Sequence, residues 1–348
     1  MDRIKQISAL DSLAMMQAKK KWNSIAKPLH SLGLLEEAVV KIAGMIGSDK
    51  VSLDKRCVVV MCSDNGVVAE GVTQTDSSVT KLVAESMAEG KANINLMAKV
   101  AQADVIVVDI GMNTDSHKSK IIKAKCSYGT HNLLKEKAMS REQALYSIEQ
   151  GITQVACCKE MGYQVIVTGE MGIGNTTTTS AIASVILQEA PEEVTGKGAG
   201  LSKVGIERKV EVIKKAIQKH QPDGKDAIDL LSKIGGYDIA GMTGLFLGGA
   251  IYKVPIVIDG IISTVAAILA TKICPGVKDY MLCSHVSKEP SGEKLLAHLG
   301  LKPLINAELC LGEGTGGILL LPLLDAALAV YNSSHQFEDL DITAYIEE

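Results

Sequence analysis

The sequence predicts an α/β fold built on a doubly wound, mostly parallel sheet with helices on both faces, and two patterns support this prediction. Short apolar runs typical of β-strands alternate along the chain with longer segments of helical periodicity. Such a strand–helix–strand succession produces a parallel sheet wrapped by helices. The runs are also continuously apolar rather than alternating, as in strands that are buried on both faces.

The predicted elements follow one another along most of the chain. Five apolar runs are predicted as strands, at residues 57–62, 103–111, 163–169, 254–260 and 280–284. The clearest helical segments between them lie at residues 78–100, 140–162 and 202–220. We expect a helical N-terminal segment at 1–50 that contributes to a small lobe, an α/β catalytic domain at 51–333 and a C-terminal tail at 334–348.

Acidic residues mark the ends of several predicted strands. Asp64 follows the first strand, Glu170 follows the third, and Asp259 lies near the end of the fourth. Asp238, in the segment GGYDIAGMTG, is a further candidate. Ligands of open α/β sheets bind beyond the carboxyl ends of the strands, so we expect these carboxylates at one edge of the sheet. Single Asp residues at such positions also act simply as caps.

The composition limits the class of protein. Hydrophobic residues make up 47% of the chain and aromatic residues only 3%, which predicts a large aliphatic core. The net charge is -4 with interspersed signs, which argues against a nucleic-acid surface. The eight cysteines form no C-x-x-C pair and no signal-type segment begins the chain, so we expect a cytoplasmic protein. Asp259, Pro322 and Asp325 interrupt the most apolar stretches, so no membrane span is expected.

The segment VTGEMGIGNTTTTSAI, at residues 167–182, predicts a strand, a glycine-rich turn and a helix start. Glycines let backbone N–H groups approach a phosphate, and a helix N-terminus adds partial positive charge. The spacing matches neither the dinucleotide motif nor the P-loop. Glu170 opposes an anion within this turn, which suits a ligand with a phosphate at one end and developing positive charge at the other. A simple Thr-capped turn is the alternative.

The segment LGEGTGG, at residues 311–317, has the same features around Glu313: small residues, a carboxylate and a helix N-terminus at Thr315. Glycines on both sides of Glu313 indicate room for an approaching ligand, and an apolar setting raises a carboxyl pKa, as a general base requires. The alternative is a partner of the helix dipole at Thr315, worth roughly 0.3–1 kcal/mol.

Other candidate chemistries find little support in the sequence. His285 lies between Ser284 and Ser287 in SHVS, but a Ser–His nucleophile pair is disfavoured because no G-x-S-x-G motif occurs. The remaining histidines have no zinc-type spacing, so no metal site is expected.

Six motifs occur in order along the chain: MCSDNGV-x-x-EGV, GEMGIGNTTT, GGYDIAGMTG, DGIIS, SH-x-S and LGEGTGG. Together they strongly resemble the nicotinate-nucleotide–dimethylbenzimidazole phosphoribosyltransferase family over residues 1–333. The resemblance implies a doubly wound α/β domain, a small lobe of chain-terminal helices and a homodimer. It also implies a reaction, in which nicotinate mononucleotide and an aromatic base give an α-ribazole 5′-phosphate and nicotinate for cobalamin synthesis. No cofactor is expected, and no metal is required because no pyrophosphate leaves.

The resemblance implies roles at the matching positions. Glu313 matches the general base that deprotonates the benzimidazole, and Glu170 matches a carboxylate near the ribose and the base. Lys209 matches the lysine that contacts the 5′-phosphate. The other matching positions form the ribose-phosphate cradle or surround the mononucleotide, and they are Gly172, Gly174, Asn175, Thr176, Thr177, Ser287, Gly312, Gly314 and Thr315.

The expected base pocket departs from the family pattern. It comprises Thr75, Val83, Met171 and Leu311. Thr75 stands where the best-studied type has a serine, Val83 where it has a glutamine, and Asp76 at the family's proline position. Other benzimidazoles, purines or phenols are therefore candidate bases, and the ribosyl donor is assigned more firmly than the acceptor.

Two rival classes make different predictions. A Rossmann-type oxidoreductase requires a dinucleotide fingerprint near the first strand, and none is present. A non-catalytic or heteromeric paralogue, using a non-benzimidazole base such as a phenol, predicts loss of Glu313 or Glu170, and both are present.

Overall fold

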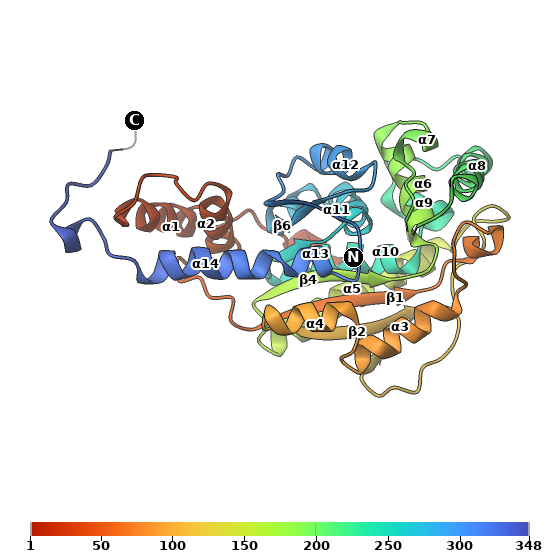
Figure 1. Cartoon of the computed structure of the whole chain (residues 1–348), viewed down its shortest axis with the longest axis horizontal. Helices are drawn as coiled ribbons and strands as arrows, with labels where there is room; N and C mark the ends of the chain where they lie inside the picture. Colours follow the sequence, from red (N-terminus) through yellow and green to blue (C-terminus); the bar gives the residue numbers. More distant parts are fainter. Residues whose placement is uncertain (1, 199, 347–348) are drawn as a thin grey trace.

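A six-stranded parallel sheet forms the centre of the computed structural model, which describes residues 2–198 and 200–346. The strand order is β3-β2-β1-β4-β5-β6, and all neighbours are parallel. Helices α3 (Ser78–Ala88) and α4 (Asn93–Val100) cover one face, and α10 (Tyr237–Tyr252) lies on the other (Figure 1). The predicted doubly wound α/β class is therefore confirmed. The strands are β1 (Arg56–Ser63), β2 (Asp104–Gly111), β3 (Ile121–Lys123), β4 (Val165–Met171), β5 (Ile256–Ile258) and β6 (Met281–Cys283).

The five predicted strands are present, with shifted ends. The predicted third strand runs two residues further, to Met171, and the predicted fourth shrinks to β5. Three strands were not predicted: β3 in the main sheet, and β7 (His285–Ser287) and β8 (Ile305–Leu309), which form a separate parallel pair. Most side chains of β3 and β8 are exposed, so these strands lack the apolar run that marks a buried strand.

One helix prediction was wrong in extent. The segment 78–100 forms two helices, α3 and α4, rather than one. Gly90 adopts a φ of +80° just beyond α3, which ends the helix. The side chain of Asn95 then accepts a hydrogen bond of 3.1 Å from the Ala92 N–H, which fixes the start of α4.

The other helices complete the two layers and one end of the molecule. Their bounds are α1 (Ser12–Ser24), α2 (Leu34–Ile46), α5 (Arg141–Glu160), α6 (Asn175–Leu187), α7 (Pro191–Val194), α8 (Lys203–His220), α9 (Ala227–Ile234), α11 (Ile261–Ile273), α12 (Gly292–Leu299), α13 (Thr315–Ile318) and α14 (Leu320–Ser333). Ser140 and Ser202 cap the two long helices α5 and α8, as the predicted spans 140–162 and 202–220 require. Short 3-10 helices lie at Asp2–Gln6, Gly66–Glu70, Pro275–Tyr280 and Glu338–Leu340.

Helices from both ends of the chain lie side by side at one end of the molecule (Figure 1). Trp22 of α1 packs on Tyr331 of α14 with ring centroids 5.0 Å apart. The Tyr331 hydroxyl donates to the Asp49 carbonyl over 2.8 Å. The division of the chain at residues 50 and 333 stays a prediction.

One helical stretch, Thr315–Ser333, is long and apolar enough to cross a membrane by composition, with a mean hydropathy of 1.4. Its most apolar part is 56% buried inside the fold, and buried core helices of soluble proteins can be equally long and apolar. Asp325 within it pairs with the buried Arg56 at the start of β1, with an N–O distance of 2.9 Å. This ion pair joins α14 to the central sheet.

Candidate active site

A cavity of about 220 Å³ opens where the carboxyl ends of β4 and β5 meet the loop before α13. It lies beside the point where the strand order reverses, between β1 and β4, which is where open α/β sheets bind ligands. The predicted site residues that line it are Glu170, Met171, Gly172, Asn175, Thr176, Asp259, Ser287, Leu311, Gly312, Glu313 and Thr315. Glu170 and Glu313, which are 143 residues apart in sequence, therefore meet at one edge of the sheet.

Several predicted residues lie outside this lining. They are Asp64, Thr75, Val83, Gly174, Thr177, Lys209, Asp238 and Gly314. Thr75 is exposed in the loop before α3, and Val83 is half-buried against the hydrophobic core. The lining also includes Ser263 and Glu289, which the sequence did not single out. Their only signal was proximity to the motifs DGIIS and SH-x-S.

Glu313 lines the cavity from a strained turn. Its φ is +62°, between Gly312 at +89° and Gly314 at +90°, in a region that L side chains rarely adopt. Its carboxylate Oε2 accepts a hydrogen bond of 3.1 Å from the N–H of Ile94, at the start of α4. Burial raises the pKa of Glu313, while the Ile94 N–H lowers it. The Glu313 carboxylate thus contacts the start of α4. A partner of the helix dipole at Thr315 would instead have to contact the start of α13.

Glu170 and Asp238 form a buried carboxyl pair bridged by an amide. Asn175 Nδ2 donates to Glu170 Oε2 and, over 3.1 Å, to Asp238 Oδ2. Burial raises the pKa of Glu170 to about 8, and the neighbouring Asp238 carboxylate also raises it. Burial raises the pKa of Asp238 to about 6. Glu170 is therefore mostly protonated at neutral pH in the free protein.

This pair predicts that the protein loses stability as the pH rises. The pKa of Glu170 is about 8 in the fold against 4.5 when unperturbed, so the folded state binds more protons than the unfolded state between these values. Unfolding then becomes easier as pH rises through that window. Glu170→Gln, which mimics the protonated form, should match the wild-type thermal midpoint near pH 5 and exceed it near pH 9. Parallel midpoint curves for the two proteins would contradict the raised pKa.

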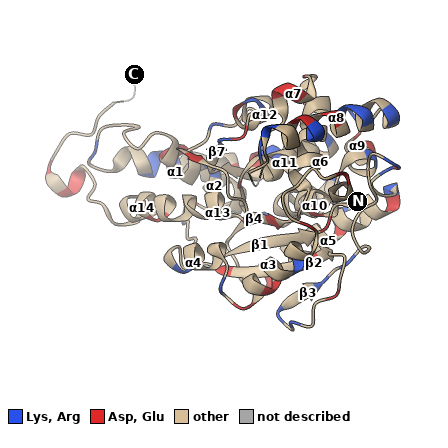
Figure 2. Cartoon of the chain, turned by 45° about the vertical axis from the view of Figure 1, so that its right-hand side comes forward, with Lys and Arg blue, Asp and Glu red and all other residues tan. Residues whose placement is uncertain are grey.

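Several Lys and Arg residues lie along α8 (Figure 2), and all of them are exposed except Lys209, which is fully buried. Its Nζ donates to Thr176 Oγ1 over 2.9 Å and to the Gly196 carbonyl over 3.4 Å. Burial lowers the pKa of Lys209 to about 8, while the charge of Glu289 raises it. A buried ammonium with two neutral acceptors is poorly compensated. An anionic group in the cavity next to Thr176 would compensate it.

His285 lines the cavity beside Ser284. Ser284 Oγ donates to the Ile258 carbonyl over 2.6 Å, so this hydroxyl can only accept from His285 Nδ1, which is 3.0 Å away. The proton of the imidazole is therefore on Nδ1, and Nε2 carries the lone pair. Burial lowers the pKa of His285. Because the Ser284 proton points to Ile258, these two residues form no nucleophile pair.

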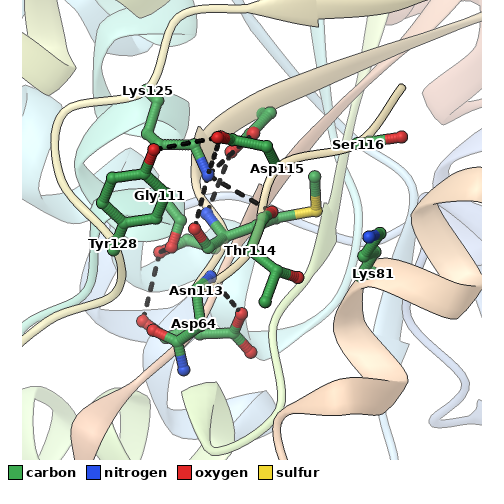
Figure 3. A network of polar contacts seen from close by, with 12 residues as sticks. Asp64, Lys81, Gly111, Asn113, Thr114, Asp115, Ser116, Lys125 and Tyr128 are labelled. Carbon is green, nitrogen blue, oxygen red and sulfur yellow. Dashed lines mark hydrogen bonds and ion pairs between the residues drawn. The ribbon is translucent and has the colours of Figure 1, made fainter. Parts of the chain in front are cut away.

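Asp64 belongs to a polar network beyond β2 and not to the cavity (Figure 3). Its Oδ2 accepts a hydrogen bond of 2.7 Å from the Asn113 N–H. In the same network Lys125 Nζ lies 3.1 Å from Asp109 and 3.3 Å from Asp115. These contacts fix the loop after β2, so Asp64 acts as an anchor for that loop.

The chemical groups around the cavity limit the reactions it can support. Within residues 2–198 and 200–346, no group of three or more His, Cys, Asp or Glu side chains is arranged to hold a metal ion. The described cysteines are all free thiols. Carboxyl groups and the start of α6 line the cavity, and the buried ammonium of Lys209 lies beside Thr176 of that helix. The fold and this cavity define an α/β protein of the class that has a polar ligand site at the carboxyl edge of a parallel sheet.

Comparison with known proteins gives the family. A family model described as phosphoribosyltransferase matches residues 7–342, so the chain belongs to this phosphoribosyltransferase family. A relative from Ruminiclostridium cellulolyticum, named nicotinate-nucleotide–dimethylbenzimidazole phosphoribosyltransferase, is 43% identical over 344 residues, covering 99% of this chain and 98% of the relative. A relative of the same name from Clostridium acetobutylicum is 43% identical over 342 residues, covering 98% of this chain and 97% of the relative.

A solved structure agrees with this family. The crystal structure of CobT from Thermus thermophilus matches with a TM-score of 0.90 and 33% identity, covering 95% of this chain and 99% of that one. The resemblance predicted from the six motifs is therefore confirmed, and the protein is a phosphoribosyltransferase.

Proposed function

We propose that this phosphoribosyltransferase transfers the 5-phosphoribosyl group of nicotinate mononucleotide to dimethylbenzimidazole or a related base in cobamide synthesis. The donor and acceptor are those in the names of its relatives. One structural observation carries the proposal: Glu170, Glu313 and Thr176 line one cavity, and Thr176 accepts a hydrogen bond from the buried Lys209. Two carboxyl groups and a buried ammonium therefore lie close to one small cavity, as the proposed reaction requires.

The phosphate of the mononucleotide is proposed to bind at the α6 end of the cavity. Asn175 and Thr176 begin α6, where unpaired N–H groups and the helix dipole favour an anion. Lys209 Nζ reaches Thr176 Oγ1 and supplies the positive charge. Gly172 and Gly174 shape the turn, and a side chain at 172 would meet Asp238 and the Ser63 carbonyl at 2.5 Å.

Glu170 is proposed to stabilise positive charge on the ribose. Cleavage of the nicotinate bond builds oxocarbenium character at the anomeric carbon, as in glycoside hydrolysis. Burial raises the pKa of Glu170 in the free protein. The bound mononucleotide carries a cationic pyridinium, which lowers this pKa again and favours the ionised carboxylate. The ring nitrogen of the departing nicotinate takes the electron pair of the broken C–N bond and loses its positive charge, so the leaving group needs no acid.

Glu313 is proposed as the general base for the incoming benzimidazole. It accepts the N–H proton so that the other ring nitrogen attacks the anomeric carbon from the opposite face, in a single displacement with inversion. Burial raises the pKa of Glu313 and makes the carboxylate a better proton acceptor near neutral pH.

The base pocket provides a prediction about selectivity. Met171 and Leu311 line the cavity, whereas Thr75 and Val83 do not. Met171→Ala should change the relative kcat/KM for dimethylbenzimidazole against benzimidazole by about 10-fold or more, the scale of a methyl-sized contact in an apolar pocket. Val83→Gln is the matched comparison. We expect it to shift the preference toward dimethylbenzimidazole, but by a smaller factor than Met171→Ala. A preference order that Met171→Ala leaves unchanged would remove Met171 from the base pocket.

The protein is proposed to act as a cytoplasmic homodimer without a cofactor. The homodimer rests on the family resemblance, and the described free cysteines fit a reducing compartment. A heteromeric paralogue with a phenol acceptor is the alternative. The molecular mass of the protein expressed alone, measured in solution, separates these two assemblies.

A competition assay tests the proposed function. Nicotinate mononucleotide would be supplied with dimethylbenzimidazole, other benzimidazoles, adenine and phenols together, and the products identified by mass. We expect an α-ribazole 5′-phosphate and free nicotinate, with a benzimidazole preferred. Release of no nicotinate in the presence of any of these bases would refute the proposal.

A further inference from the structure

The turn that carries Glu313 is held from outside by two carboxyl groups. The Glu313 N–H donates to Glu170 Oε1 over 3.4 Å. The next N–H, that of Gly314, donates to Asp259 Oδ2 over 3.2 Å, and that of Gly317 donates to Asp259 Oδ1 over 2.7 Å. Both oxygens of Asp259 thus accept backbone N–H groups, one from the N-cap residue Gly314 and one from Gly317 within α13.

Asp259 is itself rigidly placed. It follows β5, is only 3% exposed, and its N–H donates to Ser263 Oγ over 3.2 Å. The same hydroxyl lies 2.6 Å from Thr168 Oγ1 on β4. The position of this carboxylate is therefore tied to two strands of the central sheet.

The Glu313 backbone needs such a clamp. A residue with a side chain is strained at a φ of +62°, and it keeps this conformation only where its surroundings over-determine it. The glycines on either side supply little rigidity, because glycine adopts many conformations. Within the turn, the Thr315 N–H donates to the Gly312 carbonyl over 2.9 Å. The N–H groups of Glu313 and Gly314 instead donate to the carboxyl groups of Glu170 and Asp259.

We propose that Asp259 is a positioning residue for Glu313: by accepting the N–H groups of Gly314 and Gly317 it holds the strained turn so that the Glu313 carboxylate faces the incoming base. This inference rests on the proposed function of Glu313. It assigns to Asp259 no contact with the substrate, although its side chain reaches the cavity wall.

A simpler role would be that of a structural cap. A carboxylate that accepts N–H groups at the start of a helix stabilises the fold, whatever the chemistry nearby. The two roles differ in one respect. Loss of a cap lowers stability and lowers kcat by the same factor whether or not Glu313 can take a proton. Loss of a positioning residue lowers kcat only while Glu313 can take a proton.

A double-mutant cycle on kcat tests this difference. Asp259→Asn keeps the shape of the side chain but replaces one of the two acceptor oxygens with a donor. We expect it to lower kcat by about 10²-fold, the scale for misplacing a reacting group, with a much smaller change in KM for the mononucleotide. In a Glu313→Gln background the same substitution should lower kcat by less than about threefold, because the group that it positions is already inactive.

Asp109→Asn is the matched control. Asp109 is also 3% exposed, lies near the end of β2, and accepts the Met112 N–H over 2.9 Å. Whatever factor this substitution imposes on kcat should be the same with Glu313 or with Gln at position 313. Equal factors for Asp259→Asn in both backgrounds would overturn the proposal. Full turnover by Glu313→Gln alone would instead refute the general base, and with it this inference.

Two further measurements keep the test decisive if Asp259→Asn folds poorly. Asp259→Ser retains one acceptor oxygen in a smaller side chain and takes its place in the same cycle. Glu313→Gly should unfold at a higher temperature than Glu313→Ala, because only glycine relieves the positive φ. Equal midpoints for these two variants would show that the turn holds no strain and would also overturn the proposal.

Discussion

Glu313→Gln is expected to lower kcat by about 10²-fold or more, the range for loss of a positioned proton acceptor. The side chain is nearly isosteric, and its amide oxygen can still accept the hydrogen bond that Ile94 N–H gives to Oε2 over 3.1 Å. The thermal midpoint and the affinity for nicotinate mononucleotide should therefore stay close to those of the wild type. Steady-state kinetics and a melting curve on this one variant provide the measurement.

The acceptor provides the control for this prediction. The loss should shrink for acceptors that reach the site already deprotonated, because the proton transfer is then no longer needed. If Glu313 only stabilised the start of α4, the substitution would remove under about 1 kcal/mol of stability and leave turnover nearly intact. A stable and fully active Glu313→Gln protein would end the general-base assignment.

Lys209→Met is expected to weaken binding of the mononucleotide by roughly 1.5–3 kcal/mol, the range for a hydrogen bond to a charged group. This corresponds to about a 10- to 150-fold higher dissociation constant by calorimetry. Methionine keeps the buried apolar stem and removes a fully buried charge, so folding should survive or improve. Lys215→Ala is the control on the same helix, because Lys215 pairs with Glu211 at 3.2 Å and is 60% exposed.

The pH dependence of binding gives a second readout for Lys209. Burial lowers the pKa of Lys209 to about 8, so the free protein loses this positive charge as pH rises through that value. Affinity for the mononucleotide should then fall above pH 8 in the wild type, and Lys209→Met should show no such fall. Wild-type-like affinity of Lys209→Met at pH 7 would place the phosphate elsewhere.

Much of the fold and the centre of the site could be predicted from local sequence patterns. The continuous apolar runs predicted the buried strands of the main sheet, because strands covered on both faces must be apolar along their whole length. The parallel order implied by strand–helix alternation then predicted that Glu170 and Asp259 share one edge. Glycines flanking Glu313 marked an unusual backbone, and the structure contains it as a φ of +62°. The exposed strands β3 and β8 had no such signal.

The class of fold, the family and the two cavity carboxylates, Glu170 and Glu313, could be predicted without a structure, because each depends on short motifs of residues that are neighbours along the chain. The groups that surround these carboxylates are known only from the folded chain. The partner of the Glu313 carboxylate, Ile94, is 219 residues away, and Asp259 accepts N–H groups 55 and 58 residues ahead of it. The burial of Lys209, and hence its lowered pKa, likewise depends on helices packed around it. Such contacts follow from how the layers pack, and no local pattern encodes the distance between segments that meet only in the folded chain.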